Sequence, residues 1–152
     1  MNLLDSLSKR DKGKIAELQV ISKLIVMGLD LYVPVIDIGI DAILRMERHG
    51  EPSYYELQIK SSLRNVSIRG AKGIIQYINE RKPKNYYLLI SIREKEEVKH
   101  IFYLKTEQIT KFKKPFKNTE EIDIYIPAKD RDLLIKEQTL GGLIAKLRDE
   151  KG

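Results

Sequence analysis

The sequence contains no cysteine and only two histidines among its 152 residues. The absence of cysteine excludes disulfide bonds, thiol chemistry and Cys-ligated zinc. The histidines, His49 and His100, lack the short spacing of a metal-binding pair. No apolar run approaches the ~18 residues that a membrane-spanning helix needs, and the N-terminal residues lack the apolar stretch of a signal peptide. We therefore expect a soluble, cytoplasmic protein with no membrane partner.

Positive charge is concentrated in the middle of the chain. The formal net charge is +6, from 28 Lys and Arg against 22 Asp and Glu. Residues 1–59 carry 7 basic and 9 acidic side chains, residues 60–117 carry 15 and 5, and residues 118–152 carry 6 and 8. A concentrated basic surface attracts polyanions and is typical of nucleic-acid binding. Scattered, solvated lysines are the alternative explanation.

The length and the apolar spacing predict the arrangement of the chain. We expect one domain, 1–152, because no linker or repeat divides it. Helical spacing predicts a first helix at 12–27 that ends at Gly28, and the turn-rich segment after 46 predicts a hairpin. Strands are predicted at 31–35, 39–46, 54–60, 85–92, 98–104 and 122–127, and helices at 71–82, 106–112, 130–138 and 140–150. The order is α-β-β-β-α-β with a mixed tail, which indicates an α/β protein.

Two carboxylates lie where this pattern predicts partial burial. Glu17 lies at the edge of the apolar stripe of the first helix, which we place on Ile15, Leu18, Ile21, Leu24 and Ile25. Asp41 interrupts an otherwise apolar strand, and aspartate is depleted from strands. A carboxylate without a partner at such positions would be costly, which favours a functional role. A salt bridge from Glu17 to Lys14 and a structural role for Asp41 are the alternatives.

The strand at 54–60 has one apolar and one polar face. Because side chains alternate along a strand, Glu56, Gln58 and Lys60 share one face, opposite three apolar residues. An exposed sheet face would explain this strand by itself. An aspartate on the partner strand and a glutamate on the preceding helix complete what metal-assisted phosphodiester hydrolysis requires, namely oxygen ligands and a cation to stabilise developing charge.

With these residues in place, the segment 12–62 resembles the core of the PD-(D/E)xK nuclease superfamily. The matching residues are Glu17 on the helix, Gly28 in the following turn, Asp41 on the second strand, and Gln58-Ile59-Lys60 on the third. Glutamine replaces the acidic residue of the motif, as in QxK variants similar to homing and type IV restriction endonucleases and Holliday-junction resolvases. The resemblance implies a restriction-endonuclease-like αβββαβ core, in which helices flank a mixed central sheet.

The resemblance also implies the role of each residue. Asp41 would be the central metal ligand, and Gln58, the backbone carbonyl of Ile59 and Glu17 would complete the site for Mg²⁺, with Mn²⁺ as a substitute. Lys60 would orient the nucleophilic water and offset the developing negative charge. Since Gln58 removes one negative charge, Glu56 could supply a supporting carboxylate. The implied function is a metal-dependent endonuclease acting on double-stranded DNA, and the alternative is an inactive DNA-binding module.

Polar and basic residues outside this core are candidate contacts to nucleic acid. The candidates are Ser61, Ser62, Arg64, Arg69, Lys72, Lys111, Lys113 and Lys114. The two serines are also explained by turn chemistry, and the three last lysines by a solvated basic loop. Because one active site cuts one strand, we also expect a homodimer or a higher homo-oligomer.

Overall fold

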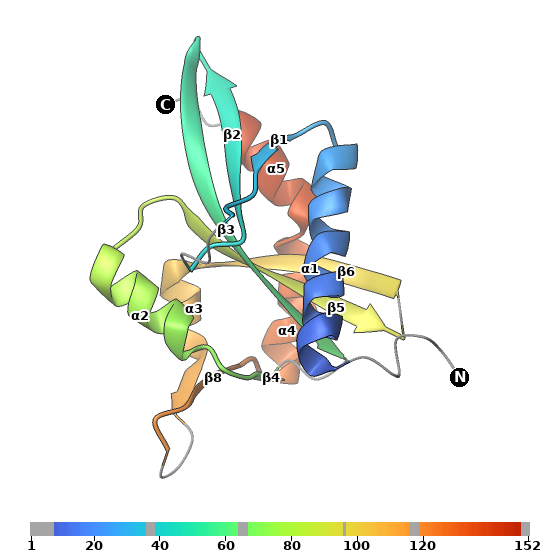
Figure 1. The fold of residues 1–152 in the computed structure, drawn as a ribbon, viewed down its shortest axis with the longest axis vertical. Coiled ribbons are helices and arrows are strands. Elements are labelled where there is room, and N and C mark those ends of the chain that lie inside the picture. Colours follow the sequence, from blue (N-terminus) through green and yellow to red (C-terminus); the bar gives the residue numbers. More distant parts are fainter. Residues whose placement is uncertain (1–7, 36–38, 64–66, 96, 116–118, 150–152) are drawn as a thin grey trace.

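The structure is a computed structural model that describes residues 8–35, 39–63, 67–95, 97–115 and 119–149. Figure 1 shows helices on both sides of a twisted sheet. The helices are α1 (Lys9–Val26), α2 (Lys72–Arg81), α3 (Thr106–Phe112), α4 (Ala128–Glu137) and α5 (Leu140–Asp149). The strands are β1 (Asp30–Tyr32), β2 (Ala42–Arg48), β3 (Glu51–Leu63), β4 (Ser67–Ile68), β5 (Tyr86–Glu94), β6 (Glu97–Lys105), β7 (Lys113–Pro115) and β8 (Ile122–Tyr125).

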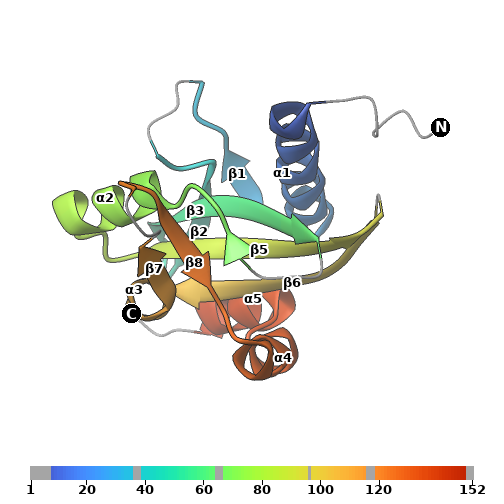
Figure 2. The same ribbon diagram turned by 90° about the horizontal axis from the view of Figure 1, so that it is seen from below.

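The central sheet has the strand order β1-β2-β3-β5-β6. β3 and β5 are parallel, whereas the other neighbouring pairs are antiparallel, so the sheet is mixed. A parallel pair needs a crossover connection, and α2 lies in the connection from β3 to β5. Three short strands form a second sheet in the order β4-β8-β7, which Figure 2 shows beside the central one.

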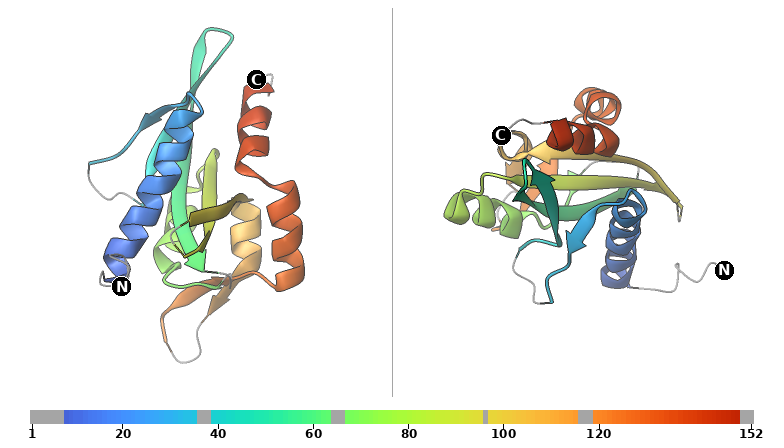
Figure 3. Two further views of the ribbon diagram at one scale, coloured as in Figure 1. Left: turned by 90° about the vertical axis from the view of Figure 1, so that its right-hand side faces the viewer. Right: turned by 90° about the horizontal axis from the view of Figure 1, so that it is seen from above.

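Two apolar layers hold the helices on the central sheet. Val20 and Leu24 of α1 pack with Leu143 and Ile144 of α5 in one layer. The other layer contains buried residues of α2 and α3. Figures 1 and 3 show α1 and α2 on opposite sides of β3. Consecutive residues of β5 therefore enter opposite layers, which explains why residues 86–92 are buried without interruption.

The predicted apolar stripe of α1 was wrong in part, since Ile21 and Leu24 are buried as predicted but two other members are not. Leu18 and Ile25 are 51% and 58% exposed, whereas Ala16, Val20 and Leu24 are fully buried at a spacing of four residues. The small side chain of Ala16 gives a weak apolar signal, and close packing of the helix on the sheet favours it there. Glu17 still lies beside this buried row, because it follows Ala16 directly.

Other boundaries require smaller corrections. The predicted hairpin is confirmed, but β2 begins at Ala42, so Asp41 precedes the strand instead of interrupting it. β3 continues to Leu63, which rules out turn chemistry at Ser61 and Ser62. The segment 111–115 is the end of α3 followed by β7, rather than a loop. In the described part of the chain, no helix is long and apolar enough to cross a membrane.

Candidate active site

The two strands of the hairpin diverge at Asp41. The last pair of their register is Ala42 with Leu57, and within the described chain β3 then runs on with β5 as its only sheet neighbour. The backbone N–H of Asp41 donates to the Leu57 carbonyl at 2.8 Å, and its Oδ2 accepts the backbone N–H of Ile59 at 2.7 Å. The carboxylate of Asp41 is thereby fixed against the open edge of β3.

The electrostatic surroundings of Asp41 are unusual for an aspartate. Burial raises the pKa of its carboxyl from 3.8 to about 6, although the hydrogen bond from Ile59 lowers it. The negative charge of Glu17 raises this pKa further, whereas Lys60 and Lys14 lower it. Two carboxylates and two ammonium groups are thus close enough to influence one another. A bound cation would relieve the repulsion between Asp41 and Glu17.

Gln58 supplies a buried oxygen that has no hydrogen-bond partner. Its side chain is half-buried on the polar face of β3, and the Oε1 atom makes no hydrogen bond to the described residues. A buried acceptor without a partner costs free energy, so natural proteins rarely leave one without a reason. Gln58 lies next to the residue that Asp41 binds, and a cation at this place would give the oxygen a partner.

Glu17 forms the salt bridge with Lys14 that was the alternative explanation for its position. Its Oε1 lies 3.2 Å from Nζ of Lys14, with side chains 16% and 60% exposed respectively. An exposed lysine in such a pair contributes little to stability and can leave its partner easily. Glu17 is therefore a carboxylate held at the edge of the site by a replaceable cation.

A cleft of about 1320 Å³ collects these residues on one surface. It includes eight of the residues predicted from the sequence: Glu17, Asp41, Gln58, Ile59, Lys60, Ser61, Ser62 and Arg69. It also includes four basic residues that sequence reasoning missed: Arg10, Lys12, Lys14 and Arg93. Arg10, Lys12 and Lys14 belong to the block 1–59, and because the net charge of this block is negative, the charge distribution did not indicate them. Arg93 enters because β5 pairs with β3, and no sequence signal gives that pairing.

Four of the remaining candidates lie outside this cleft. Lys72 pairs with Glu120 at 3.1 Å. Lys111 and Lys114 lie over the rings of Phe112 and Tyr125, and they do not line the cleft, nor does Lys113. Arg64 lies outside the described residues.

Glu56 points to a different partner from the one expected. Its Oε1 accepts a hydrogen bond from the hydroxyl of Tyr77 in α2. It does not line the cleft. The supporting carboxylate expected from Glu56 is thus engaged in fastening α2 to β3.

The donor atoms of the cleft suit a hard cation. The described residues contain no group of three or more His, Cys, Asp and Glu side chains that could hold a metal. The available set is the carboxylates of Asp41 and Glu17, one amide oxygen with no partner among the described residues and the carbonyl of Ile59, all of them oxygen donors. The third carboxylate of the cleft, that of Asp11, accepts a hydrogen bond from Ser8. Mg²⁺ and Mn²⁺ prefer oxygen ligands and tolerate a partial protein shell, because they retain bound water. The residues present therefore fit such an ion.

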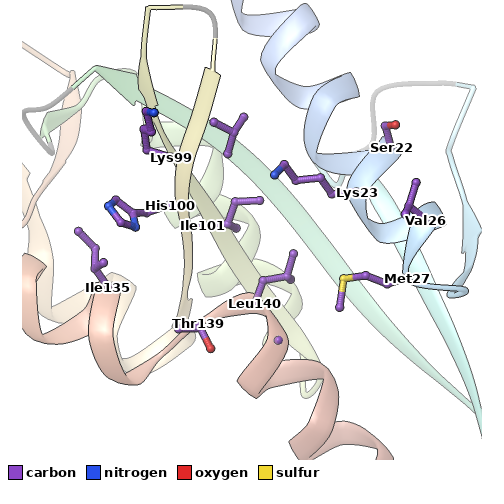
Figure 4. A pocket seen from close by; sticks show the side chains of 12 residues that line it. Ser22, Lys23, Val26, Met27, Lys99, His100, Ile101, Ile135, Thr139 and Leu140 are labelled. Atoms are coloured by element: carbon purple, nitrogen blue, oxygen red, sulfur yellow. The ribbon is translucent and has the colours of Figure 1, made fainter.

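A second recess lies between the C-terminal half of α1 and β6. It has a volume of about 540 Å³ and a largely apolar lining. Figure 4 shows Lys23 of α1 and Met27, the residue that follows this helix, facing Ile101 and Leu140 across it. Its Lys99 pairs with Glu97 at 3.0 Å, and its lining contains no carboxylate.

Comparison with known proteins relates the fold to a nuclease. No protein-family model and no curated protein matches the chain. Among solved structures, the chain is similar to a bacterial homing endonuclease, I-Ssp6803I, with a TM-score of 0.53 and 16% identity over 95% of this chain and 100% of that chain. At this identity the likeness concerns the fold. The chain therefore has a mixed α/β fold of the kind found in this endonuclease, which confirms the predicted fold class.

Proposed function

We propose that this chain is a metal-dependent endonuclease that hydrolyses phosphodiester bonds of double-stranded DNA, in a homing, restriction or junction-resolving role. The observation that carries the proposal is the constellation at the open edge of β3. There the half-buried carboxylate of Asp41, the unpartnered oxygen of Gln58 and the ammonium of Lys60 line one cleft. The fold shared with a homing endonuclease supports the same activity.

Four groups would hold the metal ion. They are the carboxylates of Asp41 and Glu17, the Oε1 atom of Gln58 and the backbone carbonyl of Ile59. When bound, Mg²⁺ or Mn²⁺ supplies Lewis acidity toward the phosphate and lowers the pKa of a coordinated water. Glu17 would exchange its contact with Lys14 for the cation, since that pair is largely exposed on the lysine side.

The protein groups then set up the displacement. Lys60 orients the attacking water and stabilises the negative charge that grows on the phosphate oxygens. Asp41 stays fixed by the hydrogen bond from the N–H of Ile59. Because Gln58, Ile59 and Lys60 are consecutive residues of β3, this strand would fix the position of the metal relative to Lys60. Water attacks phosphorus, the bond from phosphorus to the leaving oxygen breaks, and that oxygen takes up a proton.

The arrangement also favours a twofold assembly. Each chain has one such cleft among its described residues, whereas duplex DNA has two strands to be cut. We therefore propose a homodimer or a higher homo-oligomer that presents two clefts to the duplex. Light scattering that gives a monomer both free and on DNA would contradict this assembly.

Cleavage assays with and without divalent metal test the function. Duplex plasmid, four-way junction, single-stranded DNA and RNA should be incubated with Mg²⁺, Mn²⁺, Ca²⁺ or excess EDTA. We expect cleavage of duplex DNA or junctions with Mg²⁺ and Mn²⁺, and binding with slow chemistry in Ca²⁺ because its looser coordination positions the nucleophile poorly. Cleavage that persists in EDTA would contradict the mechanism. Binding without cleavage under every condition would instead indicate an inactive module, in which Gln58 marks the lost carboxylate.

A further inference from the structure

Arg93 occupies a position in the cleft that the proposed chemistry does not use. It lies near the end of β5, opposite Leu63 of β3, where the pairing of β5 with β6 shifts register between Ile92 and Arg93. Its half-buried side chain donates from Nε to Oγ of Ser61 at 2.6 Å. Lys60, Ser61 and Arg93 all line the same cleft, so this contact holds an arginine at the border of the proposed active site.

The contact with Ser61 does not neutralise this arginine. Ser61 is uncharged, and none of the described acidic residues forms an ion pair with Arg93. A half-buried guanidinium without a carboxylate partner loses hydration and gains no compensating charge inside the protein. An anionic ligand would provide that compensation.

The hydrogen bond to Ser61 also fixes the geometry of the guanidinium. A guanidinium carries five N–H donors, and the use of Nε for Ser61 leaves the two Nη groups as a planar fork. This fork matches two oxygens of one phosphate, which a lysine cannot contact in the same way. The contact therefore orients Arg93 before any ligand arrives.

The charge of the cleft favours a phosphodiester at this place. Six cationic side chains line it, Arg10, Lys12, Lys14, Lys60, Arg69 and Arg93, against the three carboxylates of Asp11, Glu17 and Asp41. Three of the cations belong to the first turns of α1 and one follows β4, so positive charge flanks the β3 edge on both sides. Such a field concentrates a polyanion along the cleft.

We propose that Arg93, aligned by Ser61, binds a backbone phosphate of the nucleic acid next to the phosphate that is cleaved. This inference rests on the proposed function, since it takes the nucleic acid to lie along the Asp41 cleft. Ser61 is a positioning residue, because it acts through the guanidinium. Together they set the register of the strand relative to Lys60.

Binding measurements in Ca²⁺ separate this role from chemistry. The affinity for a labelled DNA duplex should be measured over a range of salt concentrations for wild type, Arg93→Met, Arg93→Lys and Ser61→Ala. We expect Arg93→Met to weaken binding about tenfold and to reduce the log-log salt slope by ~0.9, because one phosphate contact is lost. Arg93→Lys should lose about threefold in affinity but retain the slope, since it keeps the charge without the fork.

The role of Ser61 is tested by a double-mutant cycle. Ser61→Ala should weaken binding about threefold in the wild-type background and have no effect in the Arg93→Met background, because it acts through that arginine. Arg148→Met and Ser22→Ala are matched controls, since both residues are exposed and line a different surface. Thermal unfolding verifies that each variant is folded, and binding is compared among the folded variants.

The outcomes distinguish this inference from the proposed function. Wild-type cleavage with unchanged affinity and salt slope in Arg93→Met would overturn the role of Arg93 alone. Equal losses in Arg93→Met and Arg148→Met would also overturn it, because the effect would then be one of net charge. Specific loss in Arg93→Met with a wild type that binds but never cleaves would support the phosphate contact and contradict the nuclease. A wild type that binds no nucleic acid would overturn both.

Discussion

The two ends of α1 border two very different recesses. The N-terminal half borders the cleft that contains Asp41 and Lys60, whereas the C-terminal half borders the apolar recess beside β6. The cleft contains a half-buried carboxylate, that of Asp41, whose pKa is raised to about 6, and an amide oxygen with no partner among the described residues. The apolar recess has a largely apolar lining, and its one described ion pair, between Lys99 and Glu97, is exposed.

This difference favours the cleft as the site of the proposed chemistry. A site that binds a metal or a charged substrate must retain polar groups that the fold itself leaves incompletely satisfied. Asp41 and Gln58 meet that criterion. The apolar lining of the recess favours a hydrophobic ligand, and none of the polar side-chain atoms in its described lining is buried without a hydrogen-bond partner. We therefore propose the cleft as the site of catalysis, and variants of the two recesses should differ accordingly.

The largest expected effect is the loss of cleavage in Asp41→Ala. The substitution removes the proposed central metal ligand, so metal-dependent cleavage should fall below detection. DNA affinity in Ca²⁺-free buffer should stay the same or rise slightly, since one negative charge near the phosphates is lost. Single-turnover cleavage and a binding titration on the same preparation measure the two quantities.

A variant of the apolar recess is the matched control for Asp41→Ala. Met27 lines this recess at the C-terminal end of α1 and is 38% exposed. In Met27→Gln, cleavage should stay within twofold of wild type. Loss of cleavage in Met27→Gln, or full cleavage in Asp41→Ala, would reverse the assignment of the two recesses.

A smaller loss is expected for Lys60→Ala. Removing one charge-stabilising group costs roughly 10² to 10³ in kcat, and the binding of DNA should change little. Lys60→Arg keeps the charge and should recover part of the rate. Turnover and KM measured on one duplex substrate give the comparison. A rise in KM at constant kcat would mean that Lys60 binds substrate uniformly and does not act in the transition state.

Sequence reasoning predicted those parts of the cleft that belong to one local pattern. The alternation along residues 54–60 and the helix before it were sufficient to place Glu17, Gln58 and Lys60 together, because strand and helix periods are local properties. Arg93 could not be predicted, since its place depends on the parallel pairing of β3 with β5 across α2. Lys111 and Lys114 stay predicted contacts to nucleic acid outside the cleft, and charge alone could not show that each lies over a neighbouring aromatic ring.

The same limit applies to the fold. Periodicity predicted the order of six elements, which are α1, β1, β2, β3, α2 and β5, and the helix at 106–112 matches the prediction at both ends. The second sheet was missed since β4 and β7 have only two and three residues and depend on β8 for pairing. Segments this short carry no periodic signal of their own.

The smallest expected effect concerns stability, and it compares Asp41 with an exposed aspartate. The pKa of the Asp41 carboxyl is about 6 in the folded protein, against an ordinary value of 3.8 that we take for the unfolded chain. Between these two pH values the folded state therefore binds a proton that the unfolded state has already released. Stability of the metal-free protein therefore decreases as pH rises from about 4 to about 6, and the full cost of the buried charge is present at pH 7.5. Asp41→Asn removes that charge and keeps a side-chain oxygen to accept the N–H of Ile59. Discounted for partial exposure, the gain in the free energy of unfolding at pH 7.5 is about 1 kcal/mol, or roughly 2–4 °C in Tm, and it should vanish at pH 4.

The control is Asp149→Asn, at an exposed position of α5, which should show no such gain. Added Mg²⁺ should stabilise wild type more than Asp41→Asn, because the carboxylate then gains its cation. Equal Tm values for wild type and Asp41→Asn at pH 7.5 in EDTA would show that Asp41 is not held under electrostatic stress, and the contrast between the two recesses would lose its physical basis.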